Sequence, residues 1–120
     1  MANEITVNTT LRCVNGNLSF LVQTGNLQFD QTAVGGPTPG FQEIGTSEET
    51  LTTSEISTLG WAFFKNLDTT NYVEVGFSTG VYGIRLEAGE IATFRVNPGS
   101  TIYLRANTAA CKVQAYVLED

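Results

Sequence analysis

Residues suited to catalysis are scarce in this chain, and histidine is missing altogether. Histidine is the commonest general base near neutral pH, so its absence removes every Ser-His and Cys-His nucleophile pair. Two carboxylate pairs remain as hydrolytic candidates, Glu87 with Glu90 and Glu48 with Glu49. General acid catalysis needs one carboxyl desolvated enough to stay protonated, whereas both pairs lie in polar, turn-rich segments. The sequence therefore predicts a protein that is not an enzyme.

The sequence also gives little support for a metal site or a cofactor site. Residues 68–71 (Asp-Thr-Thr-Asn) offer oxygen ligands, but these residue types are also what a tight turn requires. The glycines form neither a GxGxxG motif nor a P-loop ahead of a helix. We expect no metal and no cofactor.

The two cysteines, Cys13 and Cys111, both fall in predicted strands near opposite ends of the chain. If the terminal strands lie side by side, a disulfide between them is geometrically allowed. The alternative is two small buried side chains in a reducing compartment, which free cysteines commonly are. The sequence contains no CxxC or Cys/His spacing that would suggest a metal site.

Acidic residues outnumber basic ones by 12 to 6, which gives a formal net charge of −6 and a pI near 4.4. Binding to nucleic acid or to anionic lipid requires clustered Lys and Arg. Residues 1–20 hold one basic residue and no continuous apolar stretch, and no window is long enough for a membrane span. We expect neither nucleic acid nor membrane as a partner, and synthesis in the cytoplasm.

The second half of the chain alternates short apolar runs with turn residues. The runs are 61–64, 72–77, 81–86, 91–96, 101–106 and 111–118. Regular strand-and-turn spacing of this kind is typical of all-β sandwiches and barrels. We expect a single domain over residues 1–120, an all-β antiparallel sandwich of about eight or nine strands with a jelly-roll-like topology. A smaller barrel is the alternative.

Alternation within these runs predicts which side chains face the core. The predicted inward residues are Val73, Val75, Phe77, Ile84, Leu86, Ala92, Phe94, Val96, Ile102, Leu104, Ala106, Val113, Ala115 and Val117. Outward positions carry Arg85, Arg95 and Arg105, spaced ten residues apart, together with Tyr103. We expect this row to bind a carboxylate-bearing partner or to form cross-strand pairs with glutamates. Trp61 is expected in the core.

The N-terminal third predicts a three-stranded meander followed by a loop. Residues 4–14 alternate in polarity, Asn15-Gly16 is a tight-turn signal, and residues 24–26 (Thr-Gly-Asn) predict a second turn. Residues 35–40 contain three glycines and two prolines, which predicts an exposed loop over 35–41. The candidate binding residues in this third are Glu4, Ile5 and Val7 in the segment 1–10, and Gly36, Pro37, Pro39 and Phe41 in the loop.

Four stretches carry a resemblance to a known class of proteins. They are LGWAFFKNLDTTNYVEVG at 59–76, LEAGE at 86–90, FR at 94–95 and the C-terminal VQAYVLED at 113–120. Together they resemble small virion structural proteins of tailed bacteriophages, of the head decoration (cement) type.

The resemblance implies a non-enzymatic protein on the capsid surface of the virion, synthesised in the host cytoplasm. It would bind the outside of the head shell and stabilise contacts between major capsid protein subunits. It also implies a homo-oligomer, a dimer or a trimer. The segment 1–10 is then the first candidate for the capsid-facing arm, and the 35–41 loop is the second.

A glycan- or receptor-binding β-sandwich module of a phage tail or fibre is the alternative. Sugar-binding modules place flat aromatic rings on a sheet face or a loop rim. Trp61 and Tyr103 are the residues whose loss would abolish such binding.

Overall fold

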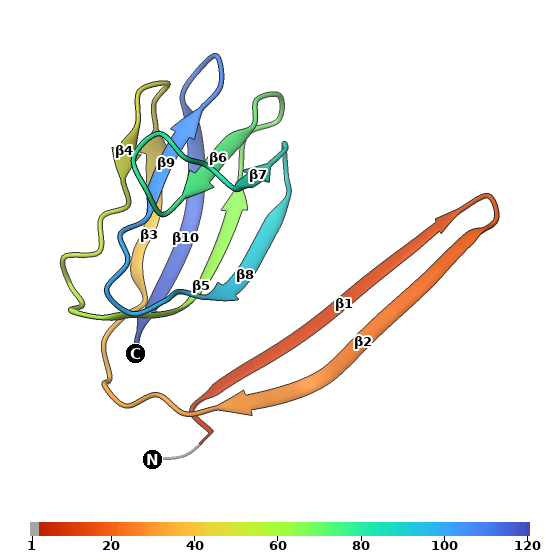
Figure 1. The fold of residues 1–120 in the computed structure, drawn as a ribbon, viewed down its shortest axis with the longest axis horizontal. Helices are drawn as coiled ribbons and strands as arrows, with labels where there is room; N and C mark the ends of the chain where they lie inside the picture. Colours follow the sequence, from red (N-terminus) through yellow and green to blue (C-terminus); the bar gives the residue numbers. More distant parts are fainter. Residues whose placement is uncertain (1–2) are drawn as a thin grey trace. The chain divides into compact units, whose positions relative to one another are not determined.

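The computed structural model describes residues 3–120 and is all-β, with no helix among the residues described (Figure 1). It divides into two compact units, one that runs to Thr32 and one that spans Ala33–Asp120. Ten strands are described, where about eight or nine were expected. The third and fourth strands, β3 (Thr38–Ile44) and β4 (Glu49–Thr50), follow each other closely in the chain but belong to different sheets.

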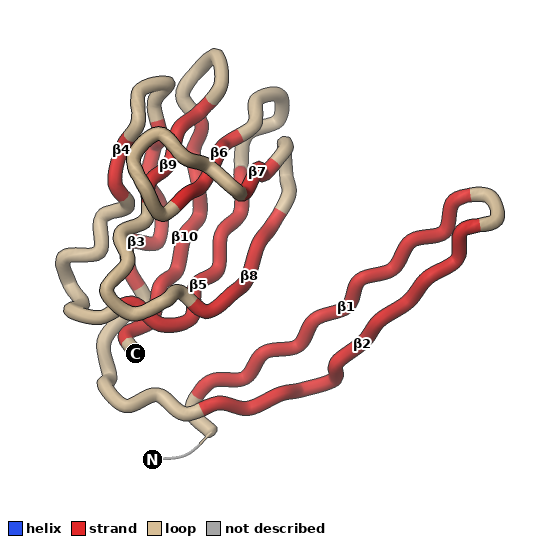
Figure 2. Tube along the Cα trace, in the orientation of Figure 1, coloured by secondary structure: helices blue, strands red, loops and turns tan. Residues whose placement is uncertain are grey.

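The first unit is a long antiparallel hairpin of two strands, β1 (Ile5–Asn15) and β2 (Leu18–Phe29) (Figure 2). Gly16 closes the hairpin at a φ of +58°, a conformation that glycine adopts without strain. The predicted meander is wrong, because β2 continues through residues 24–26 instead of turning there. Asn26 pairs with Asn8 and Gln23 with Thr10, so Thr24 and Gly25 together oppose the single residue between Asn8 and Thr10. This arrangement is a β-bulge.

The second unit is an antiparallel sandwich of two four-stranded sheets, which confirms the predicted fold class. The long sheet has the order β3-β10-β5-β8, with β3 Thr38–Ile44, β10 Cys111–Glu119, β5 Leu59–Asn66 and β8 Ile91–Arg95. The short sheet has the order β4-β9-β6-β7, with β4 Glu49–Thr50, β9 Tyr103–Ala106, β6 Val73–Gly76 and β7 Ile84–Leu86. The jelly-roll topology stays a prediction that this strand order fits. The sandwich occupies residues 33–120 rather than 1–120, because β1 and β2 pair only with each other in the described chain.

The core of the sandwich is built from the predicted inward positions. Of the residues predicted to face inward, those fully or nearly fully buried are Val73, Val75, Leu86, Val96, Ile102, Leu104, Ala106, Val113, Ala115 and Val117. Ile84, Ala92 and Phe94 are partly buried and pack against this core. Phe77 was predicted inward but is 41% exposed, because it lies beyond the end of β6 and only touches Phe94 edge-on.

The expectation that Trp61 belongs to the core is wrong. Along β5 the buried side chains are Leu59, Ala62, Phe64 and Asn66, whereas Trp61 and Phe63, on either side of Ala62, are only partly buried. Successive side chains of a strand point to opposite faces. Trp61 therefore stands on the outer face of the long sheet, opposite Arg95 of β8.

Of the predicted loop over 35–41, only residues 35–37 lie outside a strand. β3 begins at Thr38, so Pro39 and Phe41 are strand residues that pair with Tyr116 and Gln114 of β10. Proline cannot donate to a ladder, but β3 is an edge strand and needs hydrogen bonds on one side only. Thr38 is buried, and Glu119 donates its N–H to the carbonyl of Gly35 over 3.0 Å, so this stretch is attached to the sandwich.

Candidate binding surfaces

The hairpin carries one continuous apolar face. Residues that are directly opposed in an antiparallel ladder lie on the same side, so the pairs Ile5–Phe29, Val7–Leu27, Leu11–Val22, Cys13–Phe20 and Asn15–Leu18 share a face. We call the nine apolar members of these pairs the hairpin apolar face: Ile5, Val7, Leu11, Cys13, Leu18, Phe20, Val22, Leu27 and Phe29. The bulge makes this face continuous, because it shifts the alternation of β2 by one residue between Val22 and Leu27.

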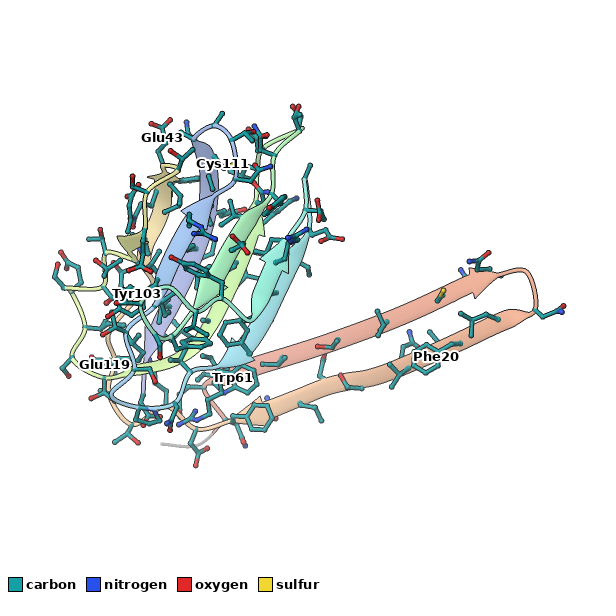
Figure 3. The ribbon with its side chains drawn as sticks, turned by 45° about the horizontal axis from the view of Figure 1, so that its top comes forward. Phe20, Glu43, Trp61, Tyr103, Cys111 and Glu119 are labelled. Atoms are coloured by element: carbon teal, nitrogen blue, oxygen red, sulfur yellow. The ribbon has the colours of Figure 1, made fainter. Side chains whose placement is uncertain are left out.

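Most of this face is open to solvent. Leu11 is 60% exposed, Leu18 56%, Phe20 46% and Val22 44%, and Phe20 stands out from β2 in Figure 3. The opposite face is polar apart from Val14 and Leu21; its other residues are Thr6, Asn8, Thr10, Arg12, Ser19, Gln23, Asn26 and Gln28. A two-stranded hairpin is at best marginally stable in water without further packing. The hairpin apolar face is therefore a candidate binding surface.

The predicted arm residues form the base of this hairpin. Ile5 is buried, Val7 is half-buried, and each is paired within the ladder. Glu4 is exposed, and its carboxylate accepts a hydrogen bond of 2.9 Å from the backbone N–H of Gln31. The described part of the segment 1–10 is therefore one side of a paired hairpin, and residues 1–2 lie outside the described chain.

The outer face of the short sheet holds a cluster of charged and aromatic groups. Glu74 of β6 lies between Arg85 of β7 and Arg105 of β9 in the ladder. Arg105 donates a 2.7 Å hydrogen bond to Glu74, which raises the pKa of Arg105, and its guanidinium lies 4.6 Å from the ring centroid of Tyr82. Arg85 lies 3.8 Å from the ring centroid of Tyr72.

A carboxylate from the 45–48 connection between β3 and β4 extends this cluster. Glu48 accepts hydrogen bonds from the Tyr82 hydroxyl and from the backbone N–H of Gly80. The bond from Tyr82 is the main reason why the pKa of Glu48 is lowered, and the same bond raises the pKa of Tyr82. Arg105 and Glu74 thus form a cross-strand pair, one of the two expected roles of the arginines, whereas Arg85 forms its ion pair with Glu87, two residues along the chain.

The structure does not assemble the three arginines into one row. Arg85 and Arg105 share the short sheet, but Arg95 belongs to β8 of the long sheet and forms an ion pair with Asp120. The three strands that carry these arginines, β7, β8 and β9, alternate between the short and the long sheet, so equal sequence spacing does not place their residues on one surface. Tyr103 is half-buried in β9, where it pairs with Thr50 and Gly76.

The remaining candidates lie along β3 and the segment before it. Gly36 and Pro37 are exposed, and Gly36 adopts a φ of +94°. Pro39 is half-buried and Phe41 is 59% exposed, both on the outer face of the long sheet. Phe41 is the one side chain of this group that presents a large apolar surface to a partner.

The groups first considered for chemistry hold turns in place. Glu90 accepts a 2.8 Å hydrogen bond from the backbone N–H of Glu87. Asp68 accepts backbone hydrogen bonds from Asn71 at 2.6 Å and Thr70 at 3.0 Å, which lower the pKa of Asp68. Cys111 is buried, which raises its pKa, whereas Cys13 is exposed, and neither forms a disulfide.

Within residues 3–120, no group of three or more acidic or cysteine side chains is placed to hold a metal ion. The same residues contain no helix long and apolar enough to cross a membrane. The fold and its surfaces define an all-β protein with a self-contained sandwich and an amphipathic hairpin. No protein-family model, curated protein or solved structure matches the chain.

Proposed function

We propose that this protein is a non-enzymatic decoration (cement) protein of a phage head, which binds the outside of the shell and stabilises contacts between major capsid protein subunits. The observation that carries the proposal is the hairpin, a long two-stranded ladder in which β1 pairs with β2 alone among the described strands. The resemblance of residues 59–76 and 113–120 to virion proteins supports the same assignment.

The two units suit different tasks in this role. The sandwich has its own buried core and supplies a rigid body. Among the described strands, β1 and β2 pair only with each other, so the outer edge of β1 presents backbone N–H and C=O groups to another strand. Strand addition at such an edge is a recurrent mode of recognition. The edge of β1, which begins with Ile5 and Val7, is our first candidate for contact with the shell, and Phe41 with the Gly36-Pro37 segment is the second.

The test uses phage particles made without the protein. We expect these particles to release their DNA at a lower temperature, and we expect added purified protein to restore their resistance. Unchanged heat resistance of the protein-free particles would contradict the proposal. Counting copies per particle separates head from tail, since hundreds of copies indicate the shell and a few tens or fewer indicate the tail.

A glycan- or receptor-binding role in a phage tail is the second candidate, and the outward position of Trp61 favours it. Trp61 and Phe63 follow one another on the outer face of β5, and the Phe63 ring lies 6.2 Å from the ring of Tyr116 on β10. Aromatic rings on a flat sheet face suit stacking on sugars. Glycan-array binding that is lost in Trp61→Ala or Tyr103→Ala would select this role over the capsid role.

A further inference from the structure

We infer that the hairpin apolar face binds the same face of a second copy of this chain, packed face to face about a two-fold axis. This inference goes beyond the proposed function and does not depend on it, because such a pairing forms in solution without any shell. It also leaves the strand edges of the hairpin free for another partner.

Continuity of the face is the first argument. Six of its nine residues count among the exposed large apolar side chains of the described structure: Leu11, Leu18, Phe20, Val22, Leu27 and Phe29. They occur in both strands and on both sides of the bulge, so the face runs along the whole ladder. Two such faces cover each other from end to end, which is the self-complementarity that a two-fold interface requires.

Charge identifies a second copy as the occupant. The chain has a net charge of −6, yet residues 5–29 contain one charged residue, Arg12, and it lies on the polar face. The acidic residues nearest in sequence are Glu4 and Asp30, outside the strands. Two copies can therefore join their hairpins without bringing carboxylates together. A basic partner would find no acidic group on this face to pair with.

The size of the face sets the strength of the contact. Strands rise about 3.3 Å per residue and lie about 4.8 Å apart, so the 11 residues of β1 paired with β2 give a face about 36 Å long and about 10 Å wide. Its flat footprint is on the order of 360 Å², below the roughly 800 Å² that each partner buries in a standard stable interface. The expected product is a weak dimer that dissociates on dilution.

Sedimentation equilibrium of the purified full chain over a wide range of concentration tests the inference. We expect a monomer–dimer equilibrium with a dissociation constant on the order of micromolar or weaker. Added salt should strengthen the dimer, because it screens repulsion between acidic bodies while leaving apolar contact intact. A complex held by opposite charges would weaken instead.

The hairpin supplies a matched pair of variants. Leu11→Thr with Val22→Thr removes an opposed Leu–Val pair from the apolar face, whereas Val14→Thr with Leu21→Thr makes the same chemical change on the polar face. All four side chains are exposed, and threonine suits strands. We expect the first variant to raise the dissociation constant at least about tenfold and the second to leave it within about twofold.

The wild-type chain offers a readout that needs no substitution. Cys13 is an exposed thiol on the apolar face, and Cys111 is buried. Alkylation of Cys13 should therefore slow as protein concentration rises through the dimerisation range. A monomer at every concentration, equal weakening by both double variants, or a Cys13 rate independent of concentration would overturn the inference.

Discussion

Asn66 is the buried polar residue from which the sandwich can be weakened most selectively. It ends β5 and is fully buried. Its amide nitrogen donates to the carbonyls of Asn71 at 2.8 Å and Leu86 at 3.0 Å, and its Oδ1 accepts from the N–H of Asp68 at 3.0 Å. One side chain therefore joins the end of β5, the following turn and the end of β7. Asn66→Ala deletes these three bonds together with a longer one, of 3.4 Å, to the carbonyl of Glu87.

The loss in free energy of unfolding caused by Asn66→Ala depends on how well water can replace each lost hydrogen bond. The bonds to Asn71 and Asp68 are partly buried, and losing each should cost about 1 kcal/mol. The bond to Leu86 is buried, and an acceptor that loses its partner away from water should cost about 1–3 kcal/mol. The sum is about 3–5 kcal/mol, which corresponds to a fall in Tm on the order of 15–30 °C for a domain of this size.

Urea unfolding followed by fluorescence of Trp61, the single tryptophan, measures this loss. Asn107→Ala is the control, because the Asn107 Oδ1 is buried without a hydrogen-bond partner. Removing that amide deletes no bond, so we expect a change within about 1 kcal/mol. If Asn66→Ala destabilised the protein no more than Asn107→Ala, the bonds of Asn66 would not be what stabilises this end of the sandwich.

Two further predictions concern the short sheet. A Cβ added at Gly76 would lie 1.9 Å from the carbonyl oxygen of Val81, whereas one at Gly83 would meet nothing within 4 Å; thermal unfolding should show Gly76→Ala less stable by about 2 kcal/mol or more and Gly83→Ala nearly unchanged. Glu48 has a pKa below its ordinary 4.5 in the folded state, so its contribution to stability is present above pH 4.5 and is lost as the pH falls through the folded pKa. Tyr82→Phe removes the main cause, so an NMR titration should show the pKa of Glu48 rising, and an unchanged value would refute this assignment.

The core of the sandwich could be predicted because its strands alternate without interruption. Val113, Ala115 and Val117 of β10 all reach zero exposure, and the polar residues between them stay outside. Period-two alternation and turn residues act locally, so a single sequence displays them. The prediction that Phe77 faces the core was wrong, because alternation does not indicate where a strand ends.

The first strand and the turn at Asn15-Gly16 could be predicted, but the continuation of β2 through residues 24–26 could not, because turns and bulges use the same residues. Thr-Gly-Asn at 24–26 satisfies a turn as well as a bulge, and Gly25 has a φ of +67° in the bulge. Only the pairing with residues 8–10 decides between the two. Without the bulge, Leu27 and Phe29 would lie on the polar side, so hydrophobic burial favours the bulged register.

The surface clusters depend on which strands are neighbours in a sheet. The sequence does not show which strands are neighbours. Glu48 and Tyr82 are 34 residues apart, and Arg95 and Asp120 are 25 apart. The period of ten that links Arg85, Arg95 and Arg105 says nothing about which sheet each strand joins. Alternation placed the three arginines on outward positions, but their partners followed from the topology.

The bulge also determines where the hairpin tolerates a change in length. Deleting either Thr24 or Gly25 would leave one residue opposite Thr9, and every pair from Ile5–Phe29 to Asn15–Leu18 would keep its partner. Deleting a residue elsewhere in β2 would transfer part of its apolar set to the other side. An insertion–deletion scan of the hairpin should therefore find a single permissive position between two intolerant stretches, so the bulge marks the natural site for varying the length of this arm.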